Sequence, residues 1–206
     1  MTDSVDDLIE SFEREAAAQD GADTGPAIGI IMGSDTDLGV MAGAHDALTE
    51  LGFVEMTADM NESANTYGFE SYVISAHRTP DLLYSYASTA ADRGIDVIIA
   101  GAGGKSADLP NMTASIAYPL PVIGVPIQEK SVDSVIGMPT GAPMTAVDAG
   151  KSFNAALSAV QILSRSDPEL VTQLEEFHAN LRESVGVVSH ELNAIGTPAY
   201  LSQVDE

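Results

Sequence analysis

The sequence predicts an α/β fold, a three-layer sandwich in which a central parallel β-sheet lies between two layers of helices. The uniformly apolar run at residues 27–32 is typical of a strand buried on both faces of a parallel sheet, and similar short runs recur along the chain. Segments of helical character lie between these runs, and strands that alternate with helices favour a parallel sheet. Ligands of such sheets bind outside the carboxyl ends of the strands, so the loops after the strands are where a site is expected.

The first half of the chain is predicted to contain two strands separated by a helix. Residues 27–32 form the first strand, and residues 36–51 have helical character and end at Gly52, a residue suited to a helix C-terminus. Residues 53–70 are polar and lack a clear period, so we expect a loop or an insertion there. Residues 72–75 form the second predicted strand.

The second half repeats this alternation. Thr79 is suited to cap a helix that begins at Pro80, and Asp167 with Pro168 marks another helix start in the same way. The remaining predicted strands are residues 96–100, 120–125 and 144–148, and the remaining predicted helices are residues 131–136, 150–164 and 168–185. The domain organisation expected from this pattern is an acidic N-terminal helix or arm (1–25), a core domain (26–165) and a C-terminal helix and tail (166–206).

The chain is strongly acidic, with 31 acidic and 8 basic residues and a formal net charge of −23. Nucleic acids and anionic membranes are bound mainly through basic patches, so the composition argues against both as partners. The first 25 residues carry eight of the acidic residues, which leaves 23 in the rest of the chain. Salt screens the repulsion between like charges, and we therefore interpret the charge as an adaptation to a salty cytoplasm rather than as a functional site.

The sequence gives no sign of a membrane or of an oxidising compartment. It contains no cysteine, which excludes disulfides and thiolate metal sites. No apolar run approaches the ~18 residues that cross a bilayer, and the acidic N-terminus is unlike a signal or transit peptide. We expect a cytoplasmic protein.

The segment from Ser75 to Pro80 combines a hydroxyl, an imidazole and a guanidinium at the end of a buried strand. Arg78 offers a bidentate fork for phosphate, and His77 can exchange a proton near neutral pH, as general acid–base catalysis requires. The alternative is a histidine that merely ends a strand beside an arginine in a surface ion pair. The place of the segment at a strand's carboxyl end favours the functional interpretation.

Two glycine-containing loops follow other predicted strands. Residues 33–37 lie between a strand and a helix N-terminus, where backbone N–H groups and the helix dipole favour phosphate, although a simple turn explains them equally well. Residues 101–106 match neither a Walker A loop nor the dinucleotide fingerprint, because Ile99 and Ser106 stand where each pattern needs glycine. The second loop still lets a ligand approach the backbone closely.

The other three histidines show no spacing typical of metal ligands. His45, His178 and His190 lie in separate segments of the chain, and no HExxH pattern is present. We expect packing or surface roles for all three and predict no metal site.

Five segments together resemble one family. IMGSDTD, SAHRTPD, VIIAGAGG, ADLPNM and PVIGVP occur in the order and approximate spacing of the N5-carboxyaminoimidazole ribonucleotide mutases, which are related to the aminoimidazole ribonucleotide carboxylases. The similarity runs from about residue 27 to residue 165. SAHRTP combined with the preceding glycine–serine loop is highly specific, whereas either alone would be weak.

The resemblance implies a flavodoxin-like three-layer fold, a homo-octamer, and an isomerase of purine (IMP) biosynthesis without metal or organic cofactor. Its reaction would convert N5-carboxyaminoimidazole ribonucleotide to 4-carboxy-5-aminoimidazole ribonucleotide. His77 would be the catalytic acid–base group. The substrate would be bound by Ser34, Asp37, Ser75, Ala76, Arg78, Ala102, Gly103 and Gly104.

The chain departs from the family pattern in three places, and separately two alternatives to the mutase stay open. The family usually reads GGAAHLPGM where this chain has GGKSADLPNM, so Asp108 stands where a histidine is expected. The loop between Pro126 and Met138 is shorter than usual, and residues 55–70 resemble an insertion. The alternatives are direct carboxylation of aminoimidazole ribonucleotide with carbon dioxide, and a non-enzymatic nucleotide-binding module.

Overall fold

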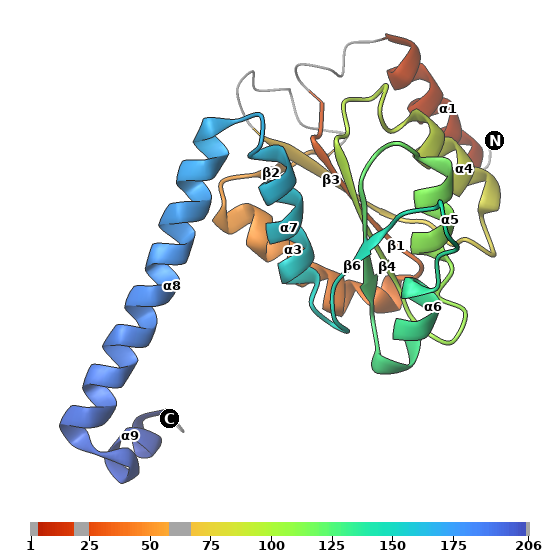
Figure 1. The fold of residues 1–206 in the computed structure, drawn as a ribbon. Coiled ribbons are helices and arrows are strands. Elements are labelled where there is room, and N and C mark those ends of the chain that lie inside the picture. Colours follow the sequence, from red (N-terminus) through yellow and green to blue (C-terminus); the bar gives the residue numbers. More distant parts are fainter. Residues whose placement is uncertain (1–3, 19–24, 58–66, 205–206) are drawn as a thin grey trace. The chain divides into compact units, whose positions relative to one another are not determined.

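The structure, a computed structural model, describes residues 4–18, 25–57 and 67–204. The chain divides into two compact units, Met1–Leu163 and Ser164–Glu206. The first unit contains a six-stranded sheet with helices on both of its faces (Figure 1).

All six strands of the sheet are parallel, in the order β2-β3-β1-β4-β5-β6. The strands are β1 (Ile28–Met32), β2 (Val54–Glu55), β3 (Gly68–Val73), β4 (Val97–Ala102), β5 (Val122–Pro126) and β6 (Thr145–Ala146). Apart from the short edge strand β2, this is the flavodoxin order 2-1-3-4-5. Every residue of β1, β4 and β5 is buried, as expected for strands covered on both faces. The predicted α/β sandwich with a parallel sheet is confirmed.

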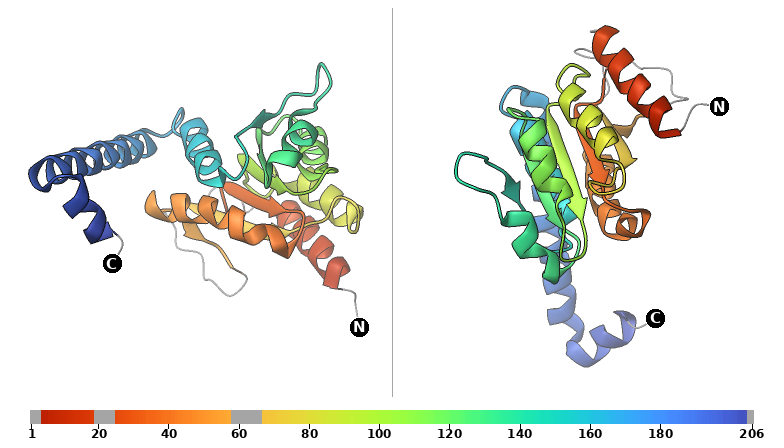
Figure 2. Two further views of the ribbon diagram at one scale, coloured as in Figure 1. Left: turned by 90° about the horizontal axis from the view of Figure 1, so that it is seen from below. Right: turned by 90° about the vertical axis from the view of Figure 1, so that its right-hand side faces the viewer.

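Two helical layers enclose the sheet, as the two views of Figure 2 show. α3 (Leu38–Glu50) and α7 (Ser152–Leu163) pack together on one face, whereas α4 (Pro80–Thr89) and α5 (Leu109–Ile116) cover the other. Short 3-10 turns, Asp35–Asp37 and Glu129–Ser131, precede α3 and α6 (Val132–Ile136). The helix predicted at residues 36–51 ends as expected, because Gly52 has a φ of 80°, which glycine adopts without strain.

The acidic N-terminal segment forms α1 (Ser4–Ala18), which packs against α4. Phe12 is completely buried, and its ring meets Tyr72 and Tyr86 edge to face at centroid distances of 5.1 and 5.3 Å. The buried Arg93 bridges the helix to the sheet, with contacts of 3.2 Å to Glu15 and 2.6 Å to Glu70. Burial by itself lowers the pKa of Arg93, but the charge and hydrogen bond of Glu70 act together with Tyr86 and Glu15 in the opposite direction, and the pKa is raised overall. An apolar anchor and a charged pair thus hold α1 on the core.

The structure differs from the sequence-based expectations at three places. Residues 53–70 contain β2 and the first half of β3. This part of β3 was not recognised because it is polar: the buried Glu70 lies in the strand, where it pairs with Arg93. The strand predicted at residues 96–100 continues to Ala102. α5 was not predicted at all, although Asp108 at its N-cap and Pro110 in its first turn are typical of a helix start. Residues 58–66 of the expected insertion lie outside the described residues.

The second unit consists of α8 (Pro168–Ile195) and α9 (Thr197–Val204). α8 begins as predicted, since the Asp167 side chain accepts a hydrogen bond of 2.9 Å from the Glu169 amide. It runs well past residue 185, because Gly186 lowers helix propensity by only about 1 kcal/mol and does not stop a long helix. Within the described part of the chain, no helix is both long enough and apolar enough to cross a membrane.

Candidate active site

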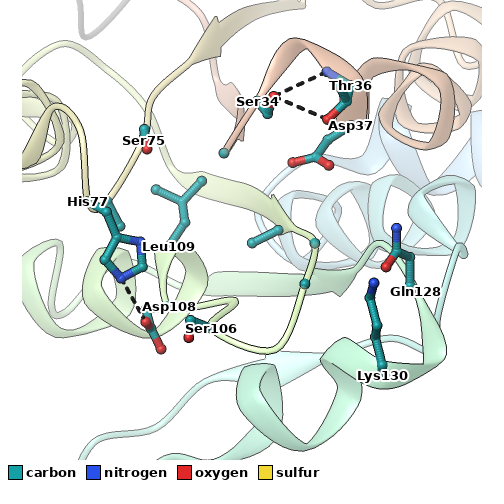
Figure 3. A pocket seen from close by; sticks show the side chains of 15 residues that line it. Ser34, Thr36, Asp37, Ser75, His77, Ser106, Asp108, Leu109, Gln128 and Lys130 are labelled. Carbon is teal, nitrogen blue, oxygen red and sulfur yellow. Dashed lines mark hydrogen bonds and ion pairs between the residues drawn. The ribbon is translucent and has the colours of Figure 1, made fainter.

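A pocket of about 260 Å³ lies at the carboxyl ends of the central strands, with walls from the loops after β1, β3, β4 and β5 (Figure 3). β1 and β4 are neighbours in the sheet, and the chain leaves them toward opposite edges, which makes this edge the topological switch point of the fold. All of the predicted site residues except Arg78 line the pocket: Ser34, Asp37, Ser75, Ala76, His77, Ala102, Gly103 and Gly104. The structure therefore brings together segments that are far apart in the sequence.

The turn after β1 is closed by its own side chains. Ser34 is the N-cap of the 3-10 turn, and its Oγ accepts hydrogen bonds from the Thr36 amide (3.3 Å) and the Thr36 hydroxyl (3.1 Å). Ser34 Oγ donates in turn to Asp35 Oδ1 at 2.9 Å. Ser34 and Thr36 both line the pocket, and these bonds fix the Ser34 hydroxyl in the turn at its wall.

The side chain of Thr79 closes the turn after β3 instead of capping α4, the helix that follows. Thr79 is the N-cap of α4 but its side chain makes no capping bond; its hydroxyl accepts from the Ser75 amide (3.0 Å) and donates to the Ser75 carbonyl (3.1 Å). This closure holds Ser75, Ala76 and His77 against the pocket.

Arg78 does not line the pocket but links two of its walls. Its Nε donates to Ser75 Oγ at 3.1 Å, and its Nη2 donates to the Gly33 carbonyl at 3.0 Å. The guanidinium therefore ties the turn after β3 to the turn after β1. It lies next to Ser75, so a phosphate bound there would meet a nearby fixed positive charge.

Asp37 is the buried carboxylate of the site. Its side chain lies between the glycines of two loops, because a Cβ added to Gly33 or Gly103 would be 3.6 or 3.2 Å from its oxygens. Burial raises the pKa of Asp37, a backbone hydrogen bond from Ser34 acts in the opposite direction, and the charge of Asp35 raises it further. The carboxylate is an acceptor suited to hydroxyl groups of a ligand.

The loop after β4 is held by residues of the next loop. Gly104 has a φ of 85°, a conformation available to glycine, and its carbonyl accepts a 2.8 Å hydrogen bond from the buried Ser131 hydroxyl. The Ile127 amide donates to the Ala102 carbonyl at 3.1 Å. Ala102, Gly103 and Gly104 thereby form a smooth wall without bulky side chains.

His77 and Asp108 face each other at the opposite side of the pocket from Gln128 and Lys130 (Figure 3). The distance between His77 Nε2 and Asp108 Oδ2 is 3.1 Å, and the two side chains are 62% and 43% exposed. The imidazole therefore stands at the rim of the pocket, where a ligand that enters can meet it.

Seven further residues that line the pocket are not among the predicted site residues: Gly33, Thr36, Ser106, Asp108, Leu109, Gln128 and Lys130. Lys130 could have been found, because it is one of only eight basic residues and follows a predicted strand. Lys105, in the loop after β4, is exposed and does not line the pocket. Among the described residues, no three His, Asp or Glu side chains are grouped so that they could hold a metal ion.

The sheet order and the pocket at its switch point define the class: a flavodoxin-like α/β protein with a site for a small polar ligand. The crystal structure of Treponema denticola PurE supports the fold, with a TM-score of 0.64 and 22% identity over 81% of this chain and 98% of that chain.

The chain belongs to the AIR carboxylase family, whose model matches residues 27–184. It is 40% identical to the N5-carboxyaminoimidazole ribonucleotide mutase of Thermotoga maritima, over 86% of this chain and 98% of the relative. The mutase of Bacillus subtilis is 43% identical over 81% of this chain and 98% of its own length. The phosphoribosylaminoimidazole carboxylase of Saccharomyces cerevisiae is 42% identical, but this chain spans only 29% of it. The resemblance seen in the sequence is confirmed.

We expect Asp37→Asn to stabilise the folded protein at neutral pH. The native pKa of Asp37 is raised above 3.8, so the wild-type protein loses stability as the pH rises from that value through the native pKa. The uncharged amide avoids this loss, and the difference should vanish below pH 3.8, where aspartate is protonated in both states. Denaturant unfolding at the two pH values measures it.

Asp46→Asn is the matched control, because Asp46 lies on α3 with 73% of its side chain exposed. We expect it to change the free energy of unfolding by no more than about 0.5 kcal/mol. If Asp37→Asn were the less stable protein at neutral pH, hydrogen bonding to the carboxylate would outweigh its burial.

Proposed function

We propose that this protein is an isomerase of purine biosynthesis that converts N5-carboxyaminoimidazole ribonucleotide to 4-carboxy-5-aminoimidazole ribonucleotide. The observation that carries the proposal is the position of His77, at the rim of a pocket whose other walls suit a phosphorylated sugar. The relatives of matching length from Thermotoga maritima and Bacillus subtilis are named as mutases. They favour this reaction over direct carboxylation, the activity in the name of the much longer yeast relative.

The residues divide into four roles in this proposal. Ser34, Ser75 and Arg78 bind the phosphate through hydroxyl and guanidinium groups, and Asp37 accepts hydrogen bonds from the ribose hydroxyls. Ala76 lines the pocket beside His77, and the wall of Ala102, Gly103 and Gly104 lies against the migrating carboxylate. No step requires a metal or an organic cofactor.

His77 can balance the protons of the reaction alone. As the bond between the exocyclic nitrogen and the carboxylate breaks, protonated His77 gives its proton to that nitrogen, and carbon dioxide is released inside the pocket. Ring carbon C4 then bonds to carbon dioxide, and the proton on C4 returns to His77. Closure of the site around the bound substrate would keep carbon dioxide close to C4 and exclude water.

We expect His77→Asn to lower kcat by about 10²- to 10⁴-fold and to leave product affinity nearly unchanged, because it removes the acid–base group alone. Arg78→Ala should instead weaken binding by about tenfold or more, since a charged hydrogen-bond donor to phosphate is lost. Turnover of N5-carboxyaminoimidazole ribonucleotide, and calorimetric titration with the product, separate the two effects.

A parallel assay with aminoimidazole ribonucleotide and bicarbonate tests the alternatives. Conversion of the carboxyamino substrate at low bicarbonate supports the mutase, and conversion of the second substrate alone would establish a direct carboxylase. Full turnover by His77→Asn would refute the mechanism, and binding without either turnover would leave a nucleotide-binding module.

We propose in addition that the protein is a homo-octamer. Support comes from an exposed seam on α8, formed by Leu181, Val185, Val188, Leu192 and Ile195, whose side chains are 37% to 67% exposed. Their alternating spacing of four and three residues places them on one face of the helix, as in the a and d positions of a coiled coil. Such a face is stabilised by pairing with a helix of another copy.

Val188→Glu should lower the molar mass measured by light scattering, which for the octamer is eight times 21.4 kDa. A charge buried in a helix pair opposes association. Val187→Glu is the control, because Val187 is as exposed as Val188 (46% and 45%) but lies off the seam. Equal masses for the two variants would contradict the role of the seam, and a wild-type mass well below the octamer would contradict the assembly.

We also propose that the protein lies in the cytoplasm and that its excess of acidic residues is an adaptation to salt. The proposed substrate is phosphorylated and does not cross membranes unaided, and a net charge of −23 suits a cytoplasm of high ionic strength. We expect the melting temperature to rise from dilute buffer to molar potassium chloride, because screening reduces the repulsion between carboxylates. Equal melting temperatures in the two solutions would refute the adaptation to salt.

A further inference from the structure

Asp108 occupies a helix N-cap without capping the helix. An N-cap aspartate usually accepts a hydrogen bond from an amide in the first turn, as Asp167 does from Glu169 at 2.9 Å. Asp108 is the N-cap of α5, yet its side chain makes no such bond. Its Oδ2 lies 3.1 Å from His77 Nε2 instead (Figure 3).

We infer that Asp108 is a positioning residue, which keeps a proton on His77 Nε2 and so leaves Nδ1 as the atom that exchanges protons with the substrate. This inference rests on the proposed function. The contact between Nε2 and the Asp108 carboxylate is an ion-pair contact of 3.1 Å. A carboxylate can only accept a hydrogen bond, so at this distance it favours the imidazole with hydrogen on Nε2, and in a neutral imidazole the other nitrogen is then the free base.

Both partners are set on fixed backbone. Asp108 stands between Ala107 and Leu109, which are both buried, and the Ala107 amide donates to Ser134 Oγ at 3.0 Å. His77 belongs to the turn that Thr79 closes through its bonds to Ser75. The pair therefore joins two separately anchored loops across the rim of the pocket, and the ring is oriented without help from a ligand.

In this inference, His77 Nδ1 gives up one proton and later takes one back, while Asp108 faces Nε2. Nδ1–H gives its proton to the exocyclic nitrogen as the nitrogen–carbon bond breaks, and Nδ1 takes the C4 proton after the carbon–carbon bond forms. Nε2–H faces the Asp108 carboxylate in both steps, and the carboxylate offsets the positive charge of the imidazolium. Asp108 itself neither gains nor loses a proton.

The exposure of the pair makes the inference testable without loss of the fold. Ion pairs as exposed as this one, at 62% and 43%, contribute little to stability. We therefore expect variants of Asp108 to unfold at nearly the wild-type temperature, so that changes in their kinetics report on the reaction.

We expect Asp108→Ala to lower kcat by about tenfold or more, with KM and product affinity nearly unchanged. Asp108→Asn keeps an acceptor without the charge and should fall between alanine and wild type, and Asp108→Glu should recover part of the loss. Asp92→Asn removes the same charge at an exposed position in the turn after α4 and should leave kcat unchanged.

Solid-state ¹⁵N NMR of histidine-labelled protein supplies a readout that a merely structural role would not move. The signals of His77, assigned by their absence in His77→Asn, should show the Nε2–H tautomer in the wild-type protein. In Asp108→Ala they should show a mixture of both tautomers. An unchanged tautomer, or a loss confined to KM, would overturn the role of Asp108.

The outcomes for the two residues separate the inference from the function. If His77→Asn is inactive while Asp108→Ala keeps wild-type kcat, the role of Asp108 fails and the mutase remains. If His77→Asn keeps its turnover, the proposed mechanism itself fails.

Discussion

The pairing of β1 with β4 is the constraint on which the candidate site depends. These strands lie side by side in register from Ile28 opposite Val97 to Met32 opposite Gly101, and the Gly33 amide extends the pairing with a 3.1 Å bond to the Gly101 carbonyl. Because both strands end at one level, their loops must diverge there, one toward α3 and the other toward α5. The pocket is the space between the diverging loops. A shift in this register would separate Asp37 from Gly103.

The layer behind the sheet sets how close the loops can come. The Met41 side chain of α3 occupies the space that a Cβ on Gly101 would need, so α3 packs directly over the end of this strand. This approach brings the N-terminal end of α3, with Asp37, over the end of β4. The helix that packs on the sheet and the carboxylate in the pocket are thus parts of one arrangement, and packing in the core fixes geometry at the surface.

The sequence contained enough information for the fold class and most of the pocket, but not for the contacts between its walls. Apolar runs revealed the central strands, and the loops after them contain the predicted residues. β3 was misjudged because a buried Glu70 is polar by sequence and becomes tolerable only through Arg93, 23 residues later along the chain. Arg78 was assigned to phosphate alone, whereas its bonds to Ser75 and Gly33 also join two turns. Such pairings depend on tertiary geometry, which no local pattern encodes.

Asp37 and Asp108, the two carboxylates that line the pocket, lie in different environments and therefore suit different roles. Asp37 is buried between glycines, where desolvation works against its charge, so it suits hydrogen bonds to neutral hydroxyl groups. Asp108 is half exposed beside an imidazole, where its charge is solvated and can face a cation at little cost. A ligand with a ribose at one end and a proton-exchanging ring at the other would meet each carboxylate in the role its surroundings allow. In a chain with 31 acidic residues, the environment of each carboxylate, rather than its presence, marks the ones that serve the site.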